Sequence, residues 1–253
     1  MKAFVRLAIT LAGVAGALGA YAAPTIPAAV VAAVANPYRP DADRQRDENR
    51  KPAETIAFSG MKAGETVADF IPGTGYYDRI FSGVVGPKGH VYAFYPAELK
   101  NFIKQPLPPD GAAPFAKFAN LTALVAPVNQ FAAPAPLDIV WLSDNYHDLH
   151  DPFFAPADLA QVNAAVFKAL KPGGVYLIID HAAEAGSGLR DTNTLHRIDE
   201  AAVKAEVEAA GFKLKGESDA LKNPADTRKV AIFDPSIKSK TDQFILKFRK
   251  PKA

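Results

Sequence analysis

The sequence contains no cysteine, so the chain forms no disulfide and has no thiol that an oxidising compartment could modify. This composition suits an exported protein. Neither a Gly-x-Ser-x-Gly elbow nor a phosphate-binding loop occurs, so acyl transfer and phosphoryl transfer have no support from motifs. Internal repeats are also absent, which argues against a solenoid or a propeller.

The chain also has no large excess of positive or negative residues. The chain has 29 Lys and Arg against 27 Asp and Glu, and its formal net charge is +2 at pH 7. Without Lys2 and Arg6, which belong to the segment described next, the two signs balance. No basic block interleaved with aromatic residues occurs, so we expect no nucleic-acid partner.

The apolar run near the N-terminus is too short for a good membrane span. Residues 7–18 are apolar, follow Lys2 and Arg6, and precede the small-x-small triplet Ala20-Tyr21-Ala22. This order is typical of a secretory signal peptide over residues 1–22. We therefore expect a periplasmic or secreted protein with no stable membrane insertion after cleavage. The alternative is an uncleaved N-terminal anchor.

The rest of the chain predicts one domain. Residues 23–40 are rich in Ala, Val and Pro and predict a tether that leads to a domain over residues 41–253. With 49% hydrophobic residues, such a domain can bury a substantial core. Residues 41–51 are densely charged, and we favour a solvent-exposed face with local ion pairs. Pro52 then opens an amphipathic segment that docks on the sheet.

The central pattern lies in residues 67–98. An apolar run that contains an acid, residues 67–71, is followed by the glycine turn 72–75, a helical segment 76–85 and a second apolar run, 90–95. This order predicts a βαβ unit with a parallel strand pair. Glycines at the first turn let a ligand approach the backbone at the helix N-terminus, so we expect the site here.

A second alternation of strands and helices follows a weaker stretch. Residues 100–114 contain too many prolines for a regular element, a short helix is expected near 115–118, and 121–125 has the content of a strand. The stronger predictions begin with a buried strand at 137–142, a helix at 156–170 that ends in Lys-Pro-Gly-Gly, and a continuous apolar strand at 175–179. A further helix is predicted at 200–210, and two closing strands at 212–215 and 242–249.

These motifs resemble class I S-adenosylmethionine-dependent methyltransferases, and more narrowly a group of predicted exported bacterial methyltransferases. The family loop is acid-x-Gly-x-Gly-x-Gly. Here Asp69 stands at the acid, Gly73 and Gly75 at the last two glycines, and Ile71 at the first. The order of strand, helix, Lys-Pro-Gly-Gly and strand over residues 137–179 is similar to the fourth and fifth strands of the family.

The resemblance implies a fold and an activity. The fold is α/β, a Rossmann-like three-layer sandwich whose seven-stranded, mostly parallel sheet ends in an antiparallel C-terminal hairpin. The activity is methyl transfer from S-adenosylmethionine, and we expect a small-molecule substrate. The alternative is an exported, non-catalytic ligand-binding protein on the same fold. In the resembling family a helix closes over the cofactor near the charged segment, so Arg44 and Arg50 are candidate lid residues.

The resemblance also implies the cofactor contacts. The family acid that holds the ribose is replaced by Tyr95 or Pro96, and the nearest carboxylate is Glu98. After the third strand, Asn129 is the amide nearest the position of the acid expected beside the adenine. The missing acids weaken nucleotide binding unless other groups substitute. The cofactor-binding candidates are Asp69, Pro72, Gly73, Thr74, Gly75, Tyr76, Tyr95, Glu98 and Asn129.

Polar side chains follow the strands 137–142 and 175–179. Adjacent parallel strands end at one edge of a sheet, so we expect these groups to face the same cavity as Gly73 and Gly75. His147 or His181 is expected to accept a proton from a substrate hydroxyl or amine. The catalytic candidates are Asn145, Tyr146, His147, Asp180 and His181.

The histidines also suggest a metal site as an alternative. His147, His150 and His181 with an aspartate could bind an ion, but their spacing matches no standard zinc pattern, and we expect no metal. For His150 and His196 we favour a simple hydrogen bond to a loop. The sequence gives no indication of the oligomeric state.

Overall fold

The computed structural model describes residues 25–101, 103–154 and 157–252. The predicted signal peptide, residues 1–22, lies outside these ranges. Within them, no helix combines the length and apolar character that a membrane crossing needs.

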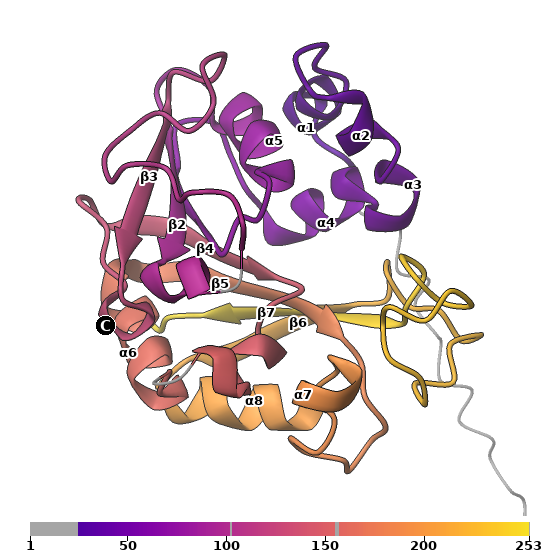
Figure 1. Cartoon of the computed structure of the whole chain (residues 1–253). Coiled ribbons are helices and arrows are strands. Elements are labelled where there is room, and N and C mark those ends of the chain that lie inside the picture. The colour runs from indigo at the N-terminus through magenta and orange to yellow at the C-terminus, as the bar shows by residue number, and fades with distance from the viewer. Residues whose placement is uncertain (1–24, 102, 155–156, 253) are drawn as a thin grey trace, which may run out of the picture.

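A seven-stranded sheet forms the centre of the molecule, in the order β3-β2-β1-β4-β5-β7-β6 (Figure 1). β1 to β5 pair in parallel, and β7 runs antiparallel to both β5 and β6. Val67 of β1 lies opposite Val91 of β2, which is the predicted parallel pairing. The predicted fold class is confirmed. The strands are β1 (Thr66–Phe70), β2 (His90–Pro96), β3 (Leu121–Ala126), β4 (Leu137–Ser143), β5 (Leu170–His181), β6 (Lys213–Ser218) and β7 (Gln243–Arg249).

Helices cover both faces of the sheet (Figure 1). One layer contains α1 (Ala28–Val34), α2 (Asp41–Arg44), α3 (Asp47–Arg50), α4 (Pro52–Ser59) and α5 (Tyr76–Val85). The other contains α6 (Leu159–Ala169), α7 (Thr192–Leu195) and α8 (Glu200–Ala209). Short 3-10 turns follow β2, β3 and β4: η1 (Ala97–Asn101), η2 (Val128–Gln130), η3 (His147–His150) and η4 (Pro152–Phe154).

The expected tether is wrong for residues 28–34, which form α1 and pack on α5. Val30 and Ala33 are buried in the core. A Cβ built on Gly83 of α5 would lie 2.9 Å from the Cβ of Ala33, so the missing side chain of Gly83 permits the close approach. Alanine is the best helix former, and burial of one face of the Ala/Val run then fixes the helix against the domain.

The short helix expected near residues 115–118 does not form. These residues make a turn closed by a hydrogen bond from the Phe118 N–H to the Phe115 carbonyl. Phe118 is buried and Phe115 is partly buried against the core. Packing of two aromatic rings, and not a local helical preference, therefore decides this conformation.

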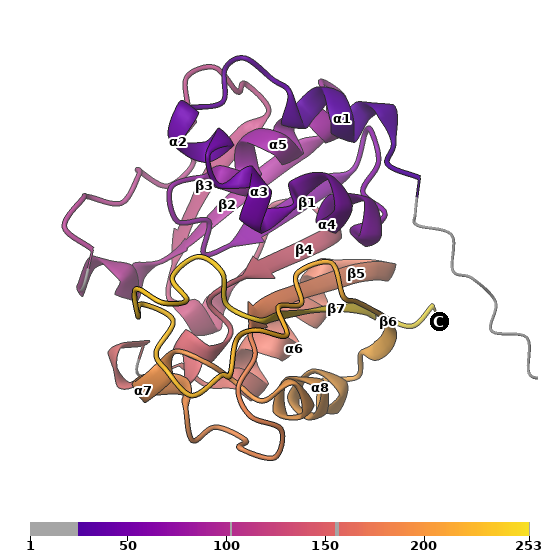
Figure 2. The same ribbon diagram turned by 90° about the vertical axis from the view of Figure 1, so that its right-hand side faces the viewer.

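The connection between β6 and β7 runs beside α3 instead of closing a short hairpin (Figure 2). Residues 219–242, coloured yellow to orange, lie next to the C-terminal ends of β4 and β5 in both ribbon views. This connection and the charged helix α3 together border the candidate site.

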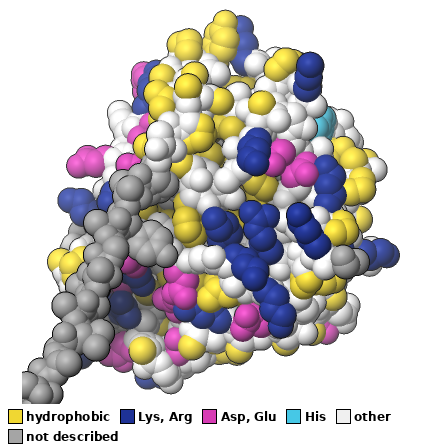
Figure 3. All heavy atoms as spheres, turned by 180° about the vertical axis from the view of Figure 1, so that it is seen from behind, with side chains coloured by type: hydrophobic (Ala, Val, Ile, Leu, Met, Phe, Trp, Pro, Cys, Tyr) yellow, Lys and Arg dark blue, Asp and Glu magenta, His cyan; other side chains and the backbone are white. Residues whose placement is uncertain are grey.

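The surface mixes both signs of charge. Seen from behind, Lys and Arg side chains gather near the middle of the face, with acidic side chains beside them (Figure 3). This distribution agrees with the small formal net charge of +2.

Candidate active site

Three adjoining cavities lie at the C-terminal ends of the central strands. The loop cavity, about 260 Å³, is lined by Asp69, Gly73 and Thr74, among others. The histidine cavity, about 550 Å³, is lined by four side chains of interest: His147, Asp148, His181 and His196. The third cavity, about 300 Å³, lies between α3 and the connection 219–242 and includes Gln45, Lys238 and Ser239. Arg50 and Asp144 line all three cavities.

The glycine turn after β1 has the backbone that the motif requires. Ile71, at the position of the first glycine, has φ 63°, a left-handed conformation that is strained for a β-branched residue. Gly73 has φ 57°, and a Cβ there would meet nothing within 4 Å. A Cβ on Gly75 would lie 2.1 Å from the ring of Phe115. Gly73 therefore faces open space, whereas Gly75 is covered.

The charged segment 41–51 is only in part the solvent-exposed face that we favoured. Asp43 and Arg79 form a buried ion pair at 2.9 Å, and Arg79 also donates to the Thr74 carbonyl at 2.8 Å. The Tyr76 hydroxyl donates to Asp47 at 2.6 Å. These contacts fasten α2 and α3 to the glycine turn, because their charged groups find partners on the loop and α5.

The two candidate lid residues differ. Arg44 forms an exposed ion pair with Asp41 and lines none of the three cavities. Arg50 pairs with Asp144, which lies 94 positions further along the chain, and its guanidinium lies 4.9 Å from the centre of the Tyr76 ring. Arg50 thus joins α3 to the C-terminal end of β4 at the point where the cavities meet.

Asp69, at the end of β1, shares a buried site with Asp78 of α5. Burial and the neighbouring carboxyl raise the pKa of Asp69 well above its usual range. Burial raises the pKa of Asp78 to about 8, against the opposing effect of Arg79. Asp69 is the hydrogen-bond partner of the Asp78 carboxyl. Both pKa shifts favour the protonated carboxyl, and a protonated member of the pair donates to the other.

This pair predicts an unusual dependence of stability on pH. The Asp78 carboxyl loses its proton near pH 4 in the unfolded chain but near pH 8 in the folded protein. Between these values the unfolded state binds fewer protons, so the free energy of unfolding falls as pH rises. Asp78→Asn removes the ionisable group and therefore its contribution to the pH dependence of the free energy of unfolding. We expect the variant to match the wild type at pH 4 and to melt at a higher temperature at pH 8.

Thermal unfolding at both pH values checks this expectation, with the exposed Asp219→Asn as the control for loss of one carboxylate. An Asp78→Asn variant that is less stable than the wild type at pH 8 would show that the carboxylate has a stabilising partner.

His147 is held between two carboxylates, which contradicts the expected role as a proton acceptor. Its Nδ1 lies 2.7 Å from Asp180 and its Nε2 lies 3.1 Å from Asp148. Burial alone would lower the pKa of His147, but Asp180 and Asp148 outweigh it and raise this pKa well above the ordinary value. The ring is therefore an imidazolium when no other cation replaces its proton, and an imidazolium cannot act as a base.

His181 has the properties expected of a base. Burial lowers its pKa, against the opposing effects of Asp144 and Asp180, so the ring is neutral at pH 7. Nδ1 lies 2.7 Å from the Thr241 hydroxyl and 3.3 Å from the side-chain nitrogen of Gln243, and no described residue makes a hydrogen bond to Nε2. The side chain lines both the histidine cavity and the third cavity.

Two other catalytic candidates lie away from the cavities. Tyr146 is fully buried, and its hydroxyl donates to Glu206 and accepts from Asn163, both at 2.9 Å. Its side chain therefore points under α8, and its expected place in the cavity is wrong. Asp180 is also fully buried, and it accepts hydrogen bonds from the backbone N–H groups of His147 and His181. Asp180 positions the histidines.

Asn145 occupies the predicted place. It lines both the loop cavity and the histidine cavity, together with Arg50 and Asp144. Gly73 and His147 therefore lie in adjoining cavities that share a wall, and not in one undivided space.

The expected nucleotide contacts are engaged elsewhere. Both oxygens of Glu98 accept from the Val128 N–H, at 3.2 and 3.1 Å. The Asn129 amide oxygen accepts from the Asp158 N–H at 2.9 Å. Tyr95 is buried in β2, and burial raises its pKa. None of the three lines the cavities described above. The carboxylate and amide brace the loops after β2 and β3, because unpaired backbone N–H groups there need acceptors.

Sequence patterns missed several residues of the site. Asp144 has φ 62° and accepts from Gln243 of β7 at 2.6 Å. Burial would raise the pKa of Asp144, but Arg50 and the hydrogen bond from Gln243 contribute to lowering it, so it is ionised. Arg46 lines the loop cavity, takes part in none of the described ion pairs and lies 5.1 Å from the Tyr76 ring centre. The partners of Asp144 come from α3 and β7, so no local sequence pattern marks this residue.

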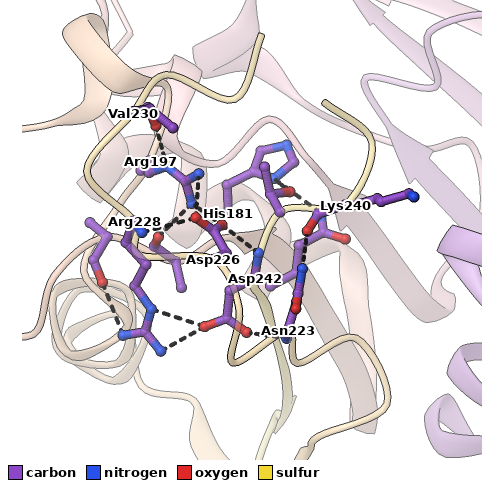
Figure 4. A network of polar contacts seen from close by, with 12 residues as sticks. His181, Arg197, Asn223, Asp226, Arg228, Val230, Lys240 and Asp242 are labelled. Atoms are coloured by element: carbon purple, nitrogen blue, oxygen red, sulfur yellow. Dashed lines mark hydrogen bonds and ion pairs between the residues drawn. The ribbon is translucent and has the colours of Figure 1, made fainter. Parts of the chain in front are cut away.

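The wall contributed by the connection 219–242 is fixed by buried charges (Figure 4). Arg197 pairs with Asp226 at 2.9 Å and donates to the carbonyls of Ala182 and Val230. Asp226 and Asp242 then join the two ends of the connection through backbone hydrogen bonds. This network holds Ile232 and Phe233 over the histidine cavity.

Comparison with known proteins supports the fold. No family model and no curated protein sequence matches the chain. A solved S-adenosylmethionine-dependent methyltransferase from Aquifex aeolicus is 20% identical, with 84% of this chain and 99% of that chain covered and a TM-score of 0.54. An arsenic(III) S-adenosylmethionine methyltransferase from Chlamydomonas reinhardtii is 16% identical, with 90% and 74% covered and a TM-score of 0.51.

A third similar structure holds the cofactor. It is a glycopeptide N-methyltransferase solved with S-adenosylmethionine, 14% identical, with 81% of this chain and 87% of that chain covered and a TM-score of 0.50. At these identities the similarity establishes the methyltransferase-like fold of this chain.

Proposed function

We propose that this protein is an exported S-adenosylmethionine-dependent methyltransferase that acts on a small molecule. The observation that carries the proposal is the position of Gly73. Its open side faces the loop cavity beside Asp69, and this cavity shares Asn145 with the histidine cavity. One cavity suits a methyl donor at the glycine turn, and its neighbour suits an acceptor.

The methionine end of the cofactor fits the residues present. Asp69 lines this cavity, and its carboxyl oxygens can accept a hydrogen bond from a cationic amino group. Arg46 is a cation in the same cavity without an ion-pair partner among the described residues, and it suits the methionine carboxylate. Gly73 permits close approach of the ligand to the backbone.

The ribose end has weaker support. Among the described residues, no carboxylate with free oxygens stands at the end of β2, since Glu98 accepts from Val128. We therefore place the cofactor affinity of this protein mainly on the methionine end.

The chemistry follows from the protonation states. When bound, S-adenosylmethionine supplies an electrophilic methyl group. His181 accepts the proton of the acceptor hydroxyl or amine at Nε2 in the tautomer whose Nδ1 carries a proton and donates to the Thr241 hydroxyl. Asp180 holds the backbone of His181, and Ile232 and Phe233 give the histidine cavity an apolar wall.

His181→Gln tests the assignment of the base. We expect methyl transfer from labelled S-adenosylmethionine to a panel of small hydroxyl and amine acceptors to fall by about 10²–10⁴-fold, since general-base catalysis is worth that much. Binding of the cofactor should stay within threefold of the wild type, because Gln keeps a hydrogen bond to Thr241. Wild-type protein that binds the cofactor but transfers no label would support a non-catalytic binding protein.

A further inference from the structure

Three side chains converge on one point at the wall of the histidine cavity. His147 Nε2 lies 3.1 Å from Asp148 Oδ1, and His196 Nδ1 lies 3.4 Å from the same oxygen. The three ligand atoms all lie within 4.8 Å of one another. In a tetrahedral site with bonds of about 2.0–2.1 Å, neighbouring ligand atoms are about 3.3 Å apart. The two distances from Asp148 match this spacing, and the two imidazole nitrogens lie within 4.8 Å of each other.

A fourth residue orients the first ligand. Asp180 Oδ1 lies 2.7 Å from His147 Nδ1, and Asp180 Oδ2 accepts from the His147 backbone N–H at 2.7 Å. Both side chains are buried. A carboxylate on the far nitrogen of a histidine fixes the ring and raises its basicity, as it does behind histidines that bind metals.

His196 lies beside Asp148 because its backbone adopts a left-handed conformation. It has φ 52° and ψ 52°, directly after α7, and its ring stands at 85° to that of His147 with 5.5 Å between centres. Phe233 packs on its other side at 4.9 Å. A non-glycine residue held in this conformation marks a constrained position.

Local charge also favours a cation. Asp151 is 2% exposed and interacts electrostatically with Asp148, His147 and His196. Three carboxylates, those of Asp148, Asp151 and Asp180, thus surround two imidazoles. Carboxylates gathered in a buried place are costly unless a cation lies nearby.

We propose that His147, Asp148 and His196 bind one divalent transition-metal ion, with an open coordination position toward the histidine cavity. Two imidazoles and one carboxylate at this spacing suit Zn²⁺ best among common ions. The metal takes the place of the proton on His147. His150 and His181 are not ligands, since they contact Glu206 and Thr241 instead. The site stands on its own geometry and does not depend on the proposed methyl transfer.

Titration of the untagged, chelator-stripped protein with Co²⁺ tests the proposal, because Co²⁺ bound by nitrogen and oxygen ligands has a visible d–d spectrum. We expect one Co²⁺ per chain with a micromolar or lower Kd, displaced by one equivalent of Zn²⁺. His196→Ala and Asp148→Ala should each weaken Co²⁺ binding at least 100-fold. Asp180→Asn, which changes the partner of the far nitrogen of His147 and removes no ligand, should weaken it about 10–100-fold.

His150→Gln is the matched control, since His150 belongs to the same 3-10 turn and also faces a carboxylate. This variant should bind Co²⁺ within threefold of the wild type. The circular dichroism spectrum of every variant is compared with that of the wild type to confirm the fold. Absence of a Co²⁺ spectrum at millimolar metal would overturn the proposal, as would unchanged affinity in a folded His196→Ala variant.

Discussion

Gly73→Val should weaken S-adenosylmethionine binding at least 100-fold. Gly73 is the residue of the glycine turn whose missing side chain opens onto the loop cavity, and a Cβ there meets no protein atom within 4 Å. An isopropyl group at this position would fill space that the ligand needs, without a clash in the free protein. Calorimetric titration of wild type and variant measures the change.

The strain of a side chain at φ 57° has to be separated from the loss of ligand space. Gly64→Val is the matched control, because Gly64 also has a positive φ, 83°, and open space around its Cβ, but lines none of the three cavities. Both variants should lose similar stability, and the control should keep its affinity within threefold. Equal affinity in the two valine variants would remove Gly73 from the binding site.

Arg197→Met should lower the melting temperature by about 10 °C. Arg197 and Asp226 have side chains that are 0% and 1% exposed, and the substitution leaves the carboxylate buried without its partner. Breaking a buried ion pair from one side costs about 3–5 kcal/mol, and each kcal/mol shifts the midpoint by about 2–4 °C in a chain of this size. Differential scanning calorimetry measures the change.

Arg44→Met provides the contrast, because the Arg44 side chain is 41% exposed and pairs on the surface with Asp41. Such a pair contributes little, so the control should melt within about 2 °C of the wild type. If Arg197→Met melted as high as this control, the buried network would not be what holds the connection 219–242 in place.

The parts of the fold that sequence patterns predicted are those set by neighbouring residues. Apolar runs, the glycine turn 72–75 and the Lys-Pro-Gly-Gly stop after α6 each have a local cause, and the parallel order of the strands follows from them. The run 28–34 was mistaken for a tether because its helix is stabilised by packing on α5, where Gly83 leaves room for Ala33. The sequence of the run alone does not show this contact.

The site was harder to predict because its groups meet across long separations. Arg50 finds Asp144 at 94 positions along the chain, and no local pattern distinguishes such an ion pair from a solvated charge. The order of His147 and His181 along the sequence did place them at one edge of the sheet. Their opposite protonation states depend on Asp148 and Asp180, whose distances only the folded chain fixes. His196 enters the site through its left-handed backbone.

Calorimetric titration of the wild-type protein with S-adenosylmethionine and S-adenosylhomocysteine tests the central claim most directly. The open face of Gly73, the carboxyl of Asp69 and Arg46 predict one site per chain with micromolar affinity for S-adenosylmethionine. Absence of heat from binding at millimolar ligand would contradict the account and leave this chain with the fold of a methyltransferase but without its cofactor.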